Sequence, residues 1–506
     1  MKFGQWTSIA ISSFAILAMT IQLSAQDNPD HKRKHHQYKL IDLGTFGGPN
    51  SGTSIFATSL TVAGTIGAAQ TPVPDPYDPN CLFSPGCFVT HAFRWQKGVL
   101  TDLGALPGTN SSYAYAINNN GLTVGISENG STDPQTGYPE VNAVVWNDGK
   151  IINLGTFGGT QTVAENLNDR GQVVGMALNA VSDPYSEALT ANPIGVYAVW
   201  PGTTQSRAFL WEKGAMRDLG TLGGPDALAY AINQRGQVAG HSYINSTPNP
   251  TTGIPTLDPF LWENGRMIDL GSLGGTISYT FWLNNRGQVV GYSDLPGDQA
   301  FHGFVWDRGA LTDLSLGGSY AAATWINDAG DAIGTSFLPG DQVYHAFLWS
   351  HGKTTDLGSI QGEPCVQGLG INEDKQVVGY SSFACSVMTD GSAFLWENGG
   401  PMVDLNALIE NPSNLHVSAG TYISDRGEIV ALGVLPSGDE HATLLVPDGD
   451  CDHDCERRIA ESPFTTRVAQ PVTPGVTRPA FGRQANWLTK PFGQRPPMPG
   501  QPRSSN

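Results

Sequence analysis

The chain has 506 residues, of which 62 are glycine and 12 are tryptophan, with 14% charged residues and a net charge of −18. Abundant glycine with few charges is typical of a turn-rich β protein and argues against a helical enzyme or a fully disordered chain. So acidic a chain repels nucleic acids and anionic membranes, and we expect neither as a partner.

Residues 1–25 have the features of a secretory signal peptide. Lys2 gives a basic start, an apolar segment follows, and small residues before and at Ala25 provide a cleavage point. The apolar run is interrupted by serines and is short for a membrane span. We therefore expect a mature protein without a membrane span, located outside the cell or in the periplasm, with an uncleaved anchor as the alternative. Residues 26–37 are interpreted as a leader linker.

A phrase that begins after this leader, "YKLIDLGTFGG" at 38, recurs along the chain. Its complete form, "AFLWEKGAMRDLGTLGG" at 208, joins an aromatic stretch, a glycine turn and Asp218. The tryptophan precedes the acid position by seven residues in Trp95–Asp102, Trp211–Asp218 and four further copies. A second phrase, such as "AINQRGQVAG" at 231, alternates with the first and also keeps a fixed length.

Both phrases predict β-hairpins, because alternating apolar and β-branched residues flank turns rich in asparagine and glycine. Four short strands per repeat are typical of a propeller blade. We predict an all-β fold with a single β-propeller over 38–447, made of eight four-stranded blades, or seven if one repeat is not a blade. The first strands are expected to begin near Ser54, Ser112, Val163, Leu228, Tyr279, Ala322, Gln367 and Ala419.

The two ends of the repeat region complement each other. The phrase at 38 is a fourth strand with no third strand before it, and "HATLLVPDG" at 441 is a third strand with no fourth strand after it. We therefore expect Tyr38–Gly44 to pair with the C-terminal blade over about 418–447. This pairing would close the ring and leave no exposed sheet edge.

The recurring phrase resembles the HAF-repeat family of extracellular repeat proteins, named for sequences such as His345-Ala346-Phe347. The resemblance covers about 38–447. It implies an exported bacterial protein and implies no established activity. The sequence departs from the repeat pattern in the degenerate first blade and at Asn142, Asn153, Arg207, Asp258 and Ser392.

The connections that vary in length all follow the second strand of a repeat, so they project from one face, as binding loops of repeat proteins do. The longest are about 65–90 and 176–206. Exposed aromatic rings there would stack on sugars or anchor a protein, although they would also serve to pin the loops to the ring. The candidate binding residues are Tyr77, Phe83, Phe88, Tyr185, Tyr197 and Trp200.

We interpret the protein as a monomeric binding or scaffold module that uses this face to bind an extracellular glycan or protein. The alternative is an extracellular enzyme, such as a polysaccharide lyase or glycosidase, with its site in the central funnel. That alternative requires several carboxylates, or a histidine with an acid, to converge at the axis. The first-strand phrases contain one charge, Glu165, and no catalytic residue is predicted.

Two repeated positions look like functional groups but are expected to be structural. A catalytic acid is needed once or twice, whereas Asp218 recurs on the outermost strand, where it should accept hydrogen bonds from the following glycine turn. The repeated histidines lie on different blades, too far apart for one metal ion. They are His91, His302, His345 and His441. Trp282 and Trp325 are expected to wedge between blades.

Six cysteines, an even number, suit an oxidising compartment. We predict the disulfides Cys365–Cys385 and Cys81–Cys87, with Cys451–Cys455 as a weaker third pair. No nucleotide loop or metal-binding motif is visible, so neither cofactor nor metal is expected. The one calcium-like pattern lacks the glycine and glutamate of an EF-hand loop. It consists of Asp448, Asp450, Asp452 and Asp454. Residues 448–506, rich in proline and arginine, are predicted to be a disordered tail.

Overall fold

The computed structural model describes residues 35–54, 57–82, 86–133, 137–185, 204–250, 252–385, 388–397, 399–410 and 413–450. The chain divides into two parts, Met1–Lys34 and His35–Asn506, and the described residues belong to the second. The expected signal peptide and nearly all of the tail lie outside these ranges. Within them, no helix combines the length and the apolar character needed to cross a membrane.

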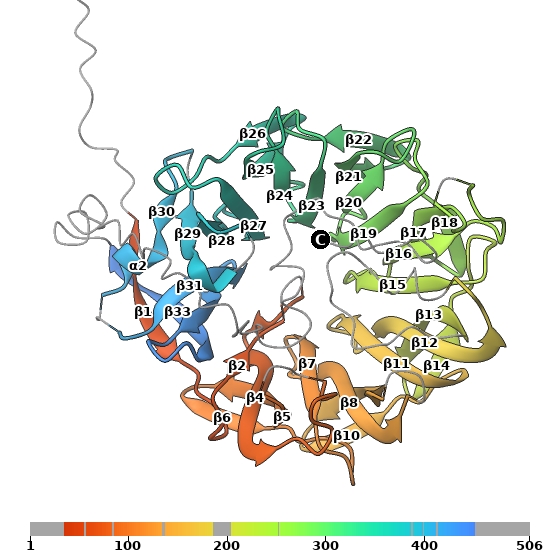
Figure 1. The fold of residues 1–506 in the computed structure, drawn as a ribbon, viewed down its shortest axis with the longest axis horizontal. Coiled ribbons are helices and arrows are strands. Elements are labelled where there is room, and N and C mark those ends of the chain that lie inside the picture. Colours follow the sequence, from red (N-terminus) through yellow and green to blue (C-terminus); the bar gives the residue numbers. More distant parts are fainter. Residues whose placement is uncertain are drawn as a thin grey trace, which may run out of the picture. The chain divides into compact units, whose positions relative to one another are not determined.

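The described residues form antiparallel sheets built from eight consecutive repeats, and repeats 2 to 7 each have four strands in chain order (Figure 1). The predicted all-β architecture of four-stranded sheets is confirmed. Repeat 1 contains β2 (Ser51–Gly52), β3 (Leu60–Thr61), β4 (Gly64–Pro74), β5 (Phe88–Gln96) and β6 (Val99–Asp102); repeat 2 contains β7 (Ser112–Ile117), β8 (Thr123–Thr132), β9 (Pro139–Asn147) and β10 (Lys150–Asn153); repeat 3 contains β11 (Gly158–Leu167), β12 (Val173–Ser182), β13 (Thr204–Glu212) and β14 (Ala215–Asp218). Repeat 4 contains β15 (Ala227–Ile232), β16 (Val238–Tyr243), β17 (Leu257–Glu263) and β18 (Arg266–Asp269); repeat 5 contains β19 (Ser278–Leu283), β20 (Val289–Asp294), β21 (Phe301–Asp307) and β22 (Ala310–Leu314); repeat 6 contains β23 (Ala321–Ile326), β24 (Ala332–Phe337), β25 (Tyr344–Ser350) and β26 (Lys353–Asp356).

Repeat 7 contains β27 (Cys365–Ile371), β28 (Val377–Ser382), the 3-10 helix η2 (Met388–Asp390), β29 (Ser392–Trp396), β30 (Val403–Asp404) and, after it, the short helix α2 (Leu405–Leu408). Repeat 8 contains β31 (His416–Ile423), β32 (Ile429–Val434), β33 (Glu440–Asp450) and the N-terminal strand β1 (His36–Asp42). A single bridge from Tyr344 to Cys365 joins the sheets of repeats 6 and 7. In Figure 1 the first strand of each repeat lies toward the middle and the fourth toward the outside.

The two ends of the repeat region pair as the sequence predicts. β1 is antiparallel to β33, with Tyr38 opposite Pro447 and Asp42 opposite Thr443. The degenerate first repeat is also visible, because its first strand is reduced to the two short pieces β2 and β3, both paired with β4. Strand exchange therefore supplies the fourth strand of repeat 8 from the other end of the chain.

The hairpin between the third and fourth strands has a two-residue turn that requires glycine. In repeat 3, Glu212 pairs with Ala215, and the turn residues Lys213 and Gly214 have φ values of 52° and 84°. Two consecutive positive φ angles define the tight turn that matches the twist of a β-hairpin, and a side chain other than glycine is strained at the second position.

Side-chain amides connect the turns between the first and second strands of neighbouring repeats. The Nδ2 group of Asn118 donates to the Asn168 carbonyl oxygen at 3.0 Å, and Asn168 repeats this contact with Asn233 at 3.1 Å. Asn233, Asn284, Asn327 and Asn372 continue the series to the carbonyl oxygen of Ser424. The asparagine of the turn phrase therefore links repeats 2 to 8.

Repeat 1 is held on both sides by other groups. The Thr61 hydroxyl donates to the Asn118 carbonyl oxygen in repeat 2 at 3.2 Å. From repeat 8, the Ala442 N–H donates to the Ser51 hydroxyl at 3.0 Å. The predicted wedge between repeats is present in repeats 5 and 6, where the rings of Trp282 and Trp325 stack with centroids 3.8 Å apart.

Candidate functional site: the bases of the two long insertions

The acid of the repeated outer hairpin has the structural role predicted for it. Asp218 Oδ1 accepts a hydrogen bond from the Gly220 N–H at 2.8 Å, and Asp102 accepts from Gly104 at 2.7 Å. Asn153, which replaces the acid in repeat 2, makes the same contact with Gly155. These side chains therefore shape the turn that leads to the next repeat.

The repeated histidine binds the acid of its own hairpin. His91 Nδ1 lies 2.8 Å from Asp102, and the same 2.8 Å separation joins His302 to Asp313. The hydrogen bond with its aspartate raises the pKa of His91 and of His302. In repeat 3 an arginine takes this position, and Arg207 Nε lies 2.8 Å from Asp218. These histidines are thus committed to local pairs.

Glu165 occupies a buried position toward the middle of the repeats. The register of the first strands shifts at one matching place in each of repeats 2 to 5, at Tyr115, Glu165, Tyr230 and Phe281. A bulge of this kind leaves one residue unpaired and re-aims its side chain. Burial raises the pKa of Glu165 to about 8, and burial and then the Glu165 carboxyl raise the pKa of Tyr230. The bulged set thus contains one acid rather than a pair.

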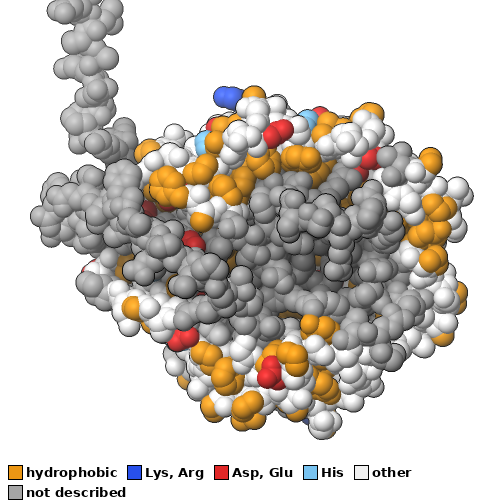
Figure 2. All heavy atoms as spheres, viewed as in Figure 1, with side chains coloured by type: hydrophobic (Ala, Val, Ile, Leu, Met, Phe, Trp, Pro, Cys, Tyr) orange, Lys and Arg blue, Asp and Glu red, His pale blue; other side chains and the backbone are white. Residues whose placement is uncertain are grey.

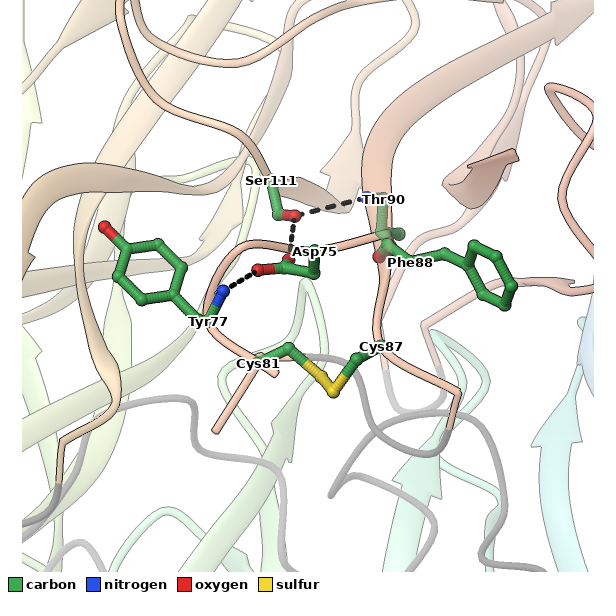
Figure 3. The surroundings of a disulfide bond; sticks show 7 residues. All are labelled: Asp75, Tyr77, Cys81, Cys87, Phe88, Thr90 and Ser111. Atoms are coloured by element: carbon green, nitrogen blue, oxygen red, sulfur yellow. Dashed lines mark hydrogen bonds between the residues drawn. A yellow bond between two sulfur atoms is a disulfide. The ribbon is translucent and has the colours of Figure 1, made fainter. Parts of the chain in front are cut away.

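Paired acids lie instead at the insertion end of the repeats, which we define as the end where the second strand leads to the third. The first insertion leaves β4 through Asp75, Pro76 and Tyr77. Asp75 Oδ1 accepts the Tyr77 N–H at 2.9 Å, and its Oδ2 accepts the Ser111 hydroxyl at 3.1 Å (Figure 3). The Ser111 oxygen also accepts the Thr90 N–H at 3.2 Å. Ser111 therefore joins both ends of the insertion to the start of β7.

Glu128 is the second acid of this first base. Its Oε2 accepts the Asn110 backbone N–H at 3.0 Å and the Asn110 Nδ2 group at 3.3 Å. Burial raises the pKa of Glu128 to about 7, and the nearby Asp75 charge acts in the same direction. Tyr77 lies near both acids, since burial and then the Glu128 charge raise the pKa of its phenol.

The second insertion leaves β12 through the same three residue types, Asp183, Pro184 and Tyr185. Asp183 Oδ1 accepts the Tyr185 N–H at 2.9 Å, as Asp75 accepts that of Tyr77. Asp226, directly before β15, accepts the Ser206 N–H at 2.7 Å through Oδ1. Asp183 acts on the pKa of Asp226 through a side-chain interaction, so this base also holds two neighbouring acids.

Aromatic side chains pack against this second base. The Tyr243 hydroxyl donates to the Tyr185 carbonyl oxygen at 3.2 Å, and the two rings meet edge to face with centroids 6.5 Å apart. Burial and then Asp183 raise the pKa of Asp226 well above the usual range of an aspartate. Because the exposed fraction of Asp226 is 0% and that of Asp183 is 5%, solvent does not reach the pair in this structure.

The structure places three of the six candidate binding residues. Tyr77, Phe88 and Tyr185 are half-buried at the insertion bases, and Tyr185 packs against the large central hydrophobic cluster. In the view of Figure 3, the rings of Tyr77 and Phe88 lie on opposite sides of the nearby disulfide. Phe83, Tyr197 and Trp200 lie outside the described residues.

Both principal disulfide predictions are confirmed. Cys81 and Cys87 are bonded across the first insertion, with Cα atoms 5.6 Å apart. Cys365 at the start of β27 is bonded to Cys385 just beyond β28, with Cα atoms 5.3 Å apart.

The third cysteine pair, Cys451 and Cys455, lies outside the described residues, as do Asp452 and Asp454 of the calcium-like pattern. Asp448 is described, and Asp450 is described by its backbone alone. No cluster of three or more potential metal ligands occurs in the part of the chain that the structure describes.

Exposed apolar side chains also mark the insertion end. Val73 and Val181 lie at equivalent positions, two residues before the anchoring aspartates, with exposed fractions of 55% and 54%. Phe383 is exposed beside the second disulfide, at the insertion end of repeat 7. In Figure 2 the hydrophobic side chains of the described part form several separate groups, with few lysine or arginine side chains among them.

The acids at the two bases were not among the predicted site residues. The Asp-Pro-Tyr sequence is present twice and was a usable signal for a shared structure. Its partners Ser111 and Asp226 each lie seven residues before a repeat asparagine, Asn118 and Asn233. The equivalence of Ser111 and Asp226 could therefore be derived from the repeat pattern. The contact of Ser111 with Asp75 could not, because it depends on how the sheets of neighbouring repeats pack together.

Searches of protein-family models and of curated proteins found no match. Solved structures with partial similarity include a puromycin-hydrolyzing peptidase of Mycobacterium tuberculosis (13% identity, 80% of this chain and 62% of that one, TM-score 0.38). Others are the β-propeller domain of the Trilobed protease from Pyrococcus furiosus (10%, 58% and 95%, 0.29) and the Trypanosoma rangeli sialidase (7%, 78% and 61%, 0.31). The chain thus spans about 62% of the peptidase's length. At these TM-scores, no property of these proteins is transferred to this chain.

Proposed function

We propose that the repeats form a single closed β-propeller of eight blades, exported from a bacterial cell. Support for closure comes from the hydrogen bonds that join each pair of consecutive repeats and repeat 8 to repeat 1, together with the pairing of β1 and β33. The two disulfides and the signal-like N-terminus favour an extracellular or periplasmic location. The resemblance to HAF-repeat proteins points the same way.

The function supported best is binding of an extracellular glycan or protein through the insertion end of the repeats, by a monomer. One observation carries this proposal: both long insertions are fixed at their bases by the same Asp-Pro-Tyr arrangement, at the same end of the sheets. Fixing both ends of a long insertion reduces the conformational entropy lost when it binds. The exposed Val73 and Val181 lie directly beside these anchors and offer apolar contact area.

Catalysis in the central funnel is the second candidate, and its strongest support is the raised pKa of Glu165. Glycoside hydrolysis requires two carboxylates that flank the substrate bond. The described bulged residues place one acid near the middle, and the carboxyl pair at Asp183 and Asp226 is buried. Binding therefore accounts for more of the described features than catalysis does.

The binding proposal is tested with the secreted protein on a glycan array and in pull-downs from extracellular material. V73D and V181D place a charge on the proposed surface, and we expect each to weaken binding at least about tenfold, since interface centres tolerate unpaired charges poorly. V99D is the matched control, because Val99 has a 61% exposed fraction but lies on β6, at the outer strand. Equal binding by V73D, V181D, V99D and the wild type would contradict the proposal.

A further inference from the structure

The two insertion bases share one layout but differ in the group that bridges it. At the first base, Ser111 accepts the Thr90 N–H and donates its hydroxyl to Asp75 at 3.1 Å. At the second base, Asp226 stands at the position equivalent to Ser111 and accepts the equivalent N–H, that of Ser206. To complete the same arrangement, Asp226 must also donate a hydrogen bond to Asp183.

An ionised carboxylate accepts hydrogen bonds and has none to donate. The Oδ2 atoms of Asp183 and Asp226 have no hydrogen-bond partner in the structure, and both side chains are buried. Two ionised carboxylates in contact here would leave two charged oxygens unsatisfied in a region of low dielectric constant, which is a costly arrangement. A single proton between them satisfies both oxygens.

We propose that Asp226 is a buried carboxylic acid that donates a hydrogen bond to Asp183, as the Ser111 hydroxyl does to Asp75, so that a bound proton anchors the second insertion. Release of this proton to solvent leaves two carboxylates in contact and removes the anchor. The inference concerns the anchor alone and holds whatever the insertions bind.

The surrounding groups are compatible with a neutral Asp226. Arg207 on β13 favours its ionisation, but the guanidinium is already bound to Asp218 at 2.8 Å and to the Pro225 carbonyl oxygen at 3.1 Å. Tyr243 on β16 interacts with both carboxyl groups and with the phenols of Tyr185 and Tyr279. His241, also on β16, meets Tyr279 with ring centroids 4.7 Å apart, and burial lowers its pKa to about 3, so it is neutral. These phenols supply no positive charge.

The direction in which pH changes the stability of the fold follows from the raised pKa of Asp226. Burial and Asp183 raise the pKa of Asp226 in the folded protein above its value in the unfolded chain. The folded state therefore binds more protons than the unfolded state, and its stability falls as the pH rises from the unfolded pKa to the folded pKa. Above the folded pKa the anchor itself opens.

Amide hydrogen exchange of the full secreted chain tests the proposal, with rates corrected for the intrinsic pH dependence of exchange. We expect protection of the segment Asp183–Tyr185 to fall about tenfold between about pH 7 and about pH 10, as the strength of a hydrogen bond to a charged group implies. D226N is the matched variant, because its amide accepts from Ser206 and donates to Asp183 without a titrating proton. Its protection should be independent of pH.

Infrared spectroscopy gives a second readout that does not depend on loop motion. The difference spectrum of wild type minus D226N at neutral pH should contain the carbonyl band of one protonated, buried carboxyl, because other buried acids such as Glu165, with a pKa raised to about 8, contribute equally to both spectra and cancel. D226S should keep the anchor and lose the same Asp226 contribution to the band, since serine performs this role at the first base.

Three results would overturn the proposal. The first is a pH profile of Asp183–Tyr185 that is the same in D226N and the wild type. The second is a difference spectrum of wild type minus D226N that lacks the carbonyl band of a protonated carboxyl. The third is a change in protection at neutral pH when calcium is added or chelated, because it would assign the pair to a cation rather than a proton. The segment Asp75–Tyr77 is the internal control and should respond to D226N at no pH.

Discussion

The first and second long insertions leave their sheets through the same three residue types, yet their anchors are built differently. At the first base a neutral hydroxyl, that of Ser111, bridges to Asp75, and the second acid, Glu128, is held separately by Asn110. At the second base the residue in the bridging position is itself an acid, Asp226, whose pKa is raised by burial and by the neighbouring Asp183. The first insertion is also closed by a disulfide, whereas residues 176–206 contain no cysteine.

The chemistry of one bridging residue therefore decides whether the proposed hydrogen bond to the anchoring aspartate depends on pH. Both bases need a group that accepts one backbone N–H and donates to one aspartate. A serine hydroxyl can accept and donate at the same time, and it does not titrate at any ordinary pH. An aspartate can donate a hydrogen bond only while its carboxyl group holds a proton. Exchanging these groups between the two bases should change the stability and the pH dependence of each anchor.

S111D has the largest expected effect, because it adds a carboxylate beside Asp75 and Glu128 in a buried site. We expect the free energy of unfolding at neutral pH to fall by about 3 kcal/mol, in line with the burial of an unpaired charge. Chemical denaturation measures this change. S111N is the control of equal size, and its amide keeps both hydrogen bonds, so its loss should stay below about 1 kcal/mol. If S111D and S111N lose the same stability, shape rather than charge governs the site.

Removal of the first disulfide tests the covalent part of the difference. For a loop of six residues, the loss of the Cys81–Cys87 link in C81S/C87S should cost about 2 kcal/mol, chiefly through the entropy of the unfolded chain. Hydrogen exchange should become faster in the segment Asp75–Tyr77 and stay unchanged in Asp183–Tyr185. Equal changes in both segments would show that the two bases are mechanically coupled.

Much of this fold followed from sequence periodicity. The fixed spacing from Trp211 to Asp218 defined a hairpin whose strands and turn are present, and Asp218 binds the turn N–H of Gly220 as predicted. The pairing of β1 with β33 followed from two incomplete phrases at the ends of the repeat region. These features depend on residues that are close in sequence and recur in each repeat, so the same pattern could be recognised several times along the chain.

The side-chain pairs within the outer hairpins were not predicted, although their residues lie at a fixed spacing in the sequence. His91 lies 11 residues before Asp102, Arg207 lies 11 before Asp218, and Asn142 lies 11 before Asn153, to which it donates at 3.2 Å. In repeat 2 asparagine replaces the acid at position 153, and its partner Asn142 is uncharged as well, where repeats 1 and 3 have a histidine and an arginine. The insertion anchors were harder to predict, because Ser111 meets Asp75 across 36 residues and through the junction of two sheets.

E128Q measures how much the second acid of the first base destabilises the protein. The folded pKa of Glu128 is raised to about 7, from 4.5, so the native state favours the protonated form. The associated stability is present below the unfolded pKa and is lost as the pH rises through the folded value. E128Q should therefore match the wild type at about pH 4 and exceed it by about 1–2 kcal/mol at about pH 8. Urea denaturation at both pH values decides this, and a difference that does not change with pH would contradict the assignment.

The smallest expected effect comes from exchanging the residues that begin the outer hairpin after each insertion. His91 pairs with Asp102 after the first insertion, and Arg207 pairs with Asp218 after the second. The pKa of His91 is raised by Asp102, so its stabilisation is complete below the unfolded pKa and disappears as the pH rises through the folded pKa. Arginine keeps its charge throughout this range. Because both aspartates are substantially exposed, each pair contributes about 0.5 kcal/mol or less.

H91R should therefore flatten the pH dependence of stability between about pH 6 and about pH 8 by that amount relative to the wild type, and R207H should steepen it equally. Unfolding free energies of the two variants and of the double variant, measured at both pH values, provide the comparison. In the double variant the two changes should cancel, because the pairs are far apart in sequence and share no partner. A double variant that instead follows R207H alone would show that the position after the second insertion is more sensitive than its counterpart, and that the difference between the two insertions extends beyond their bases into the sheet.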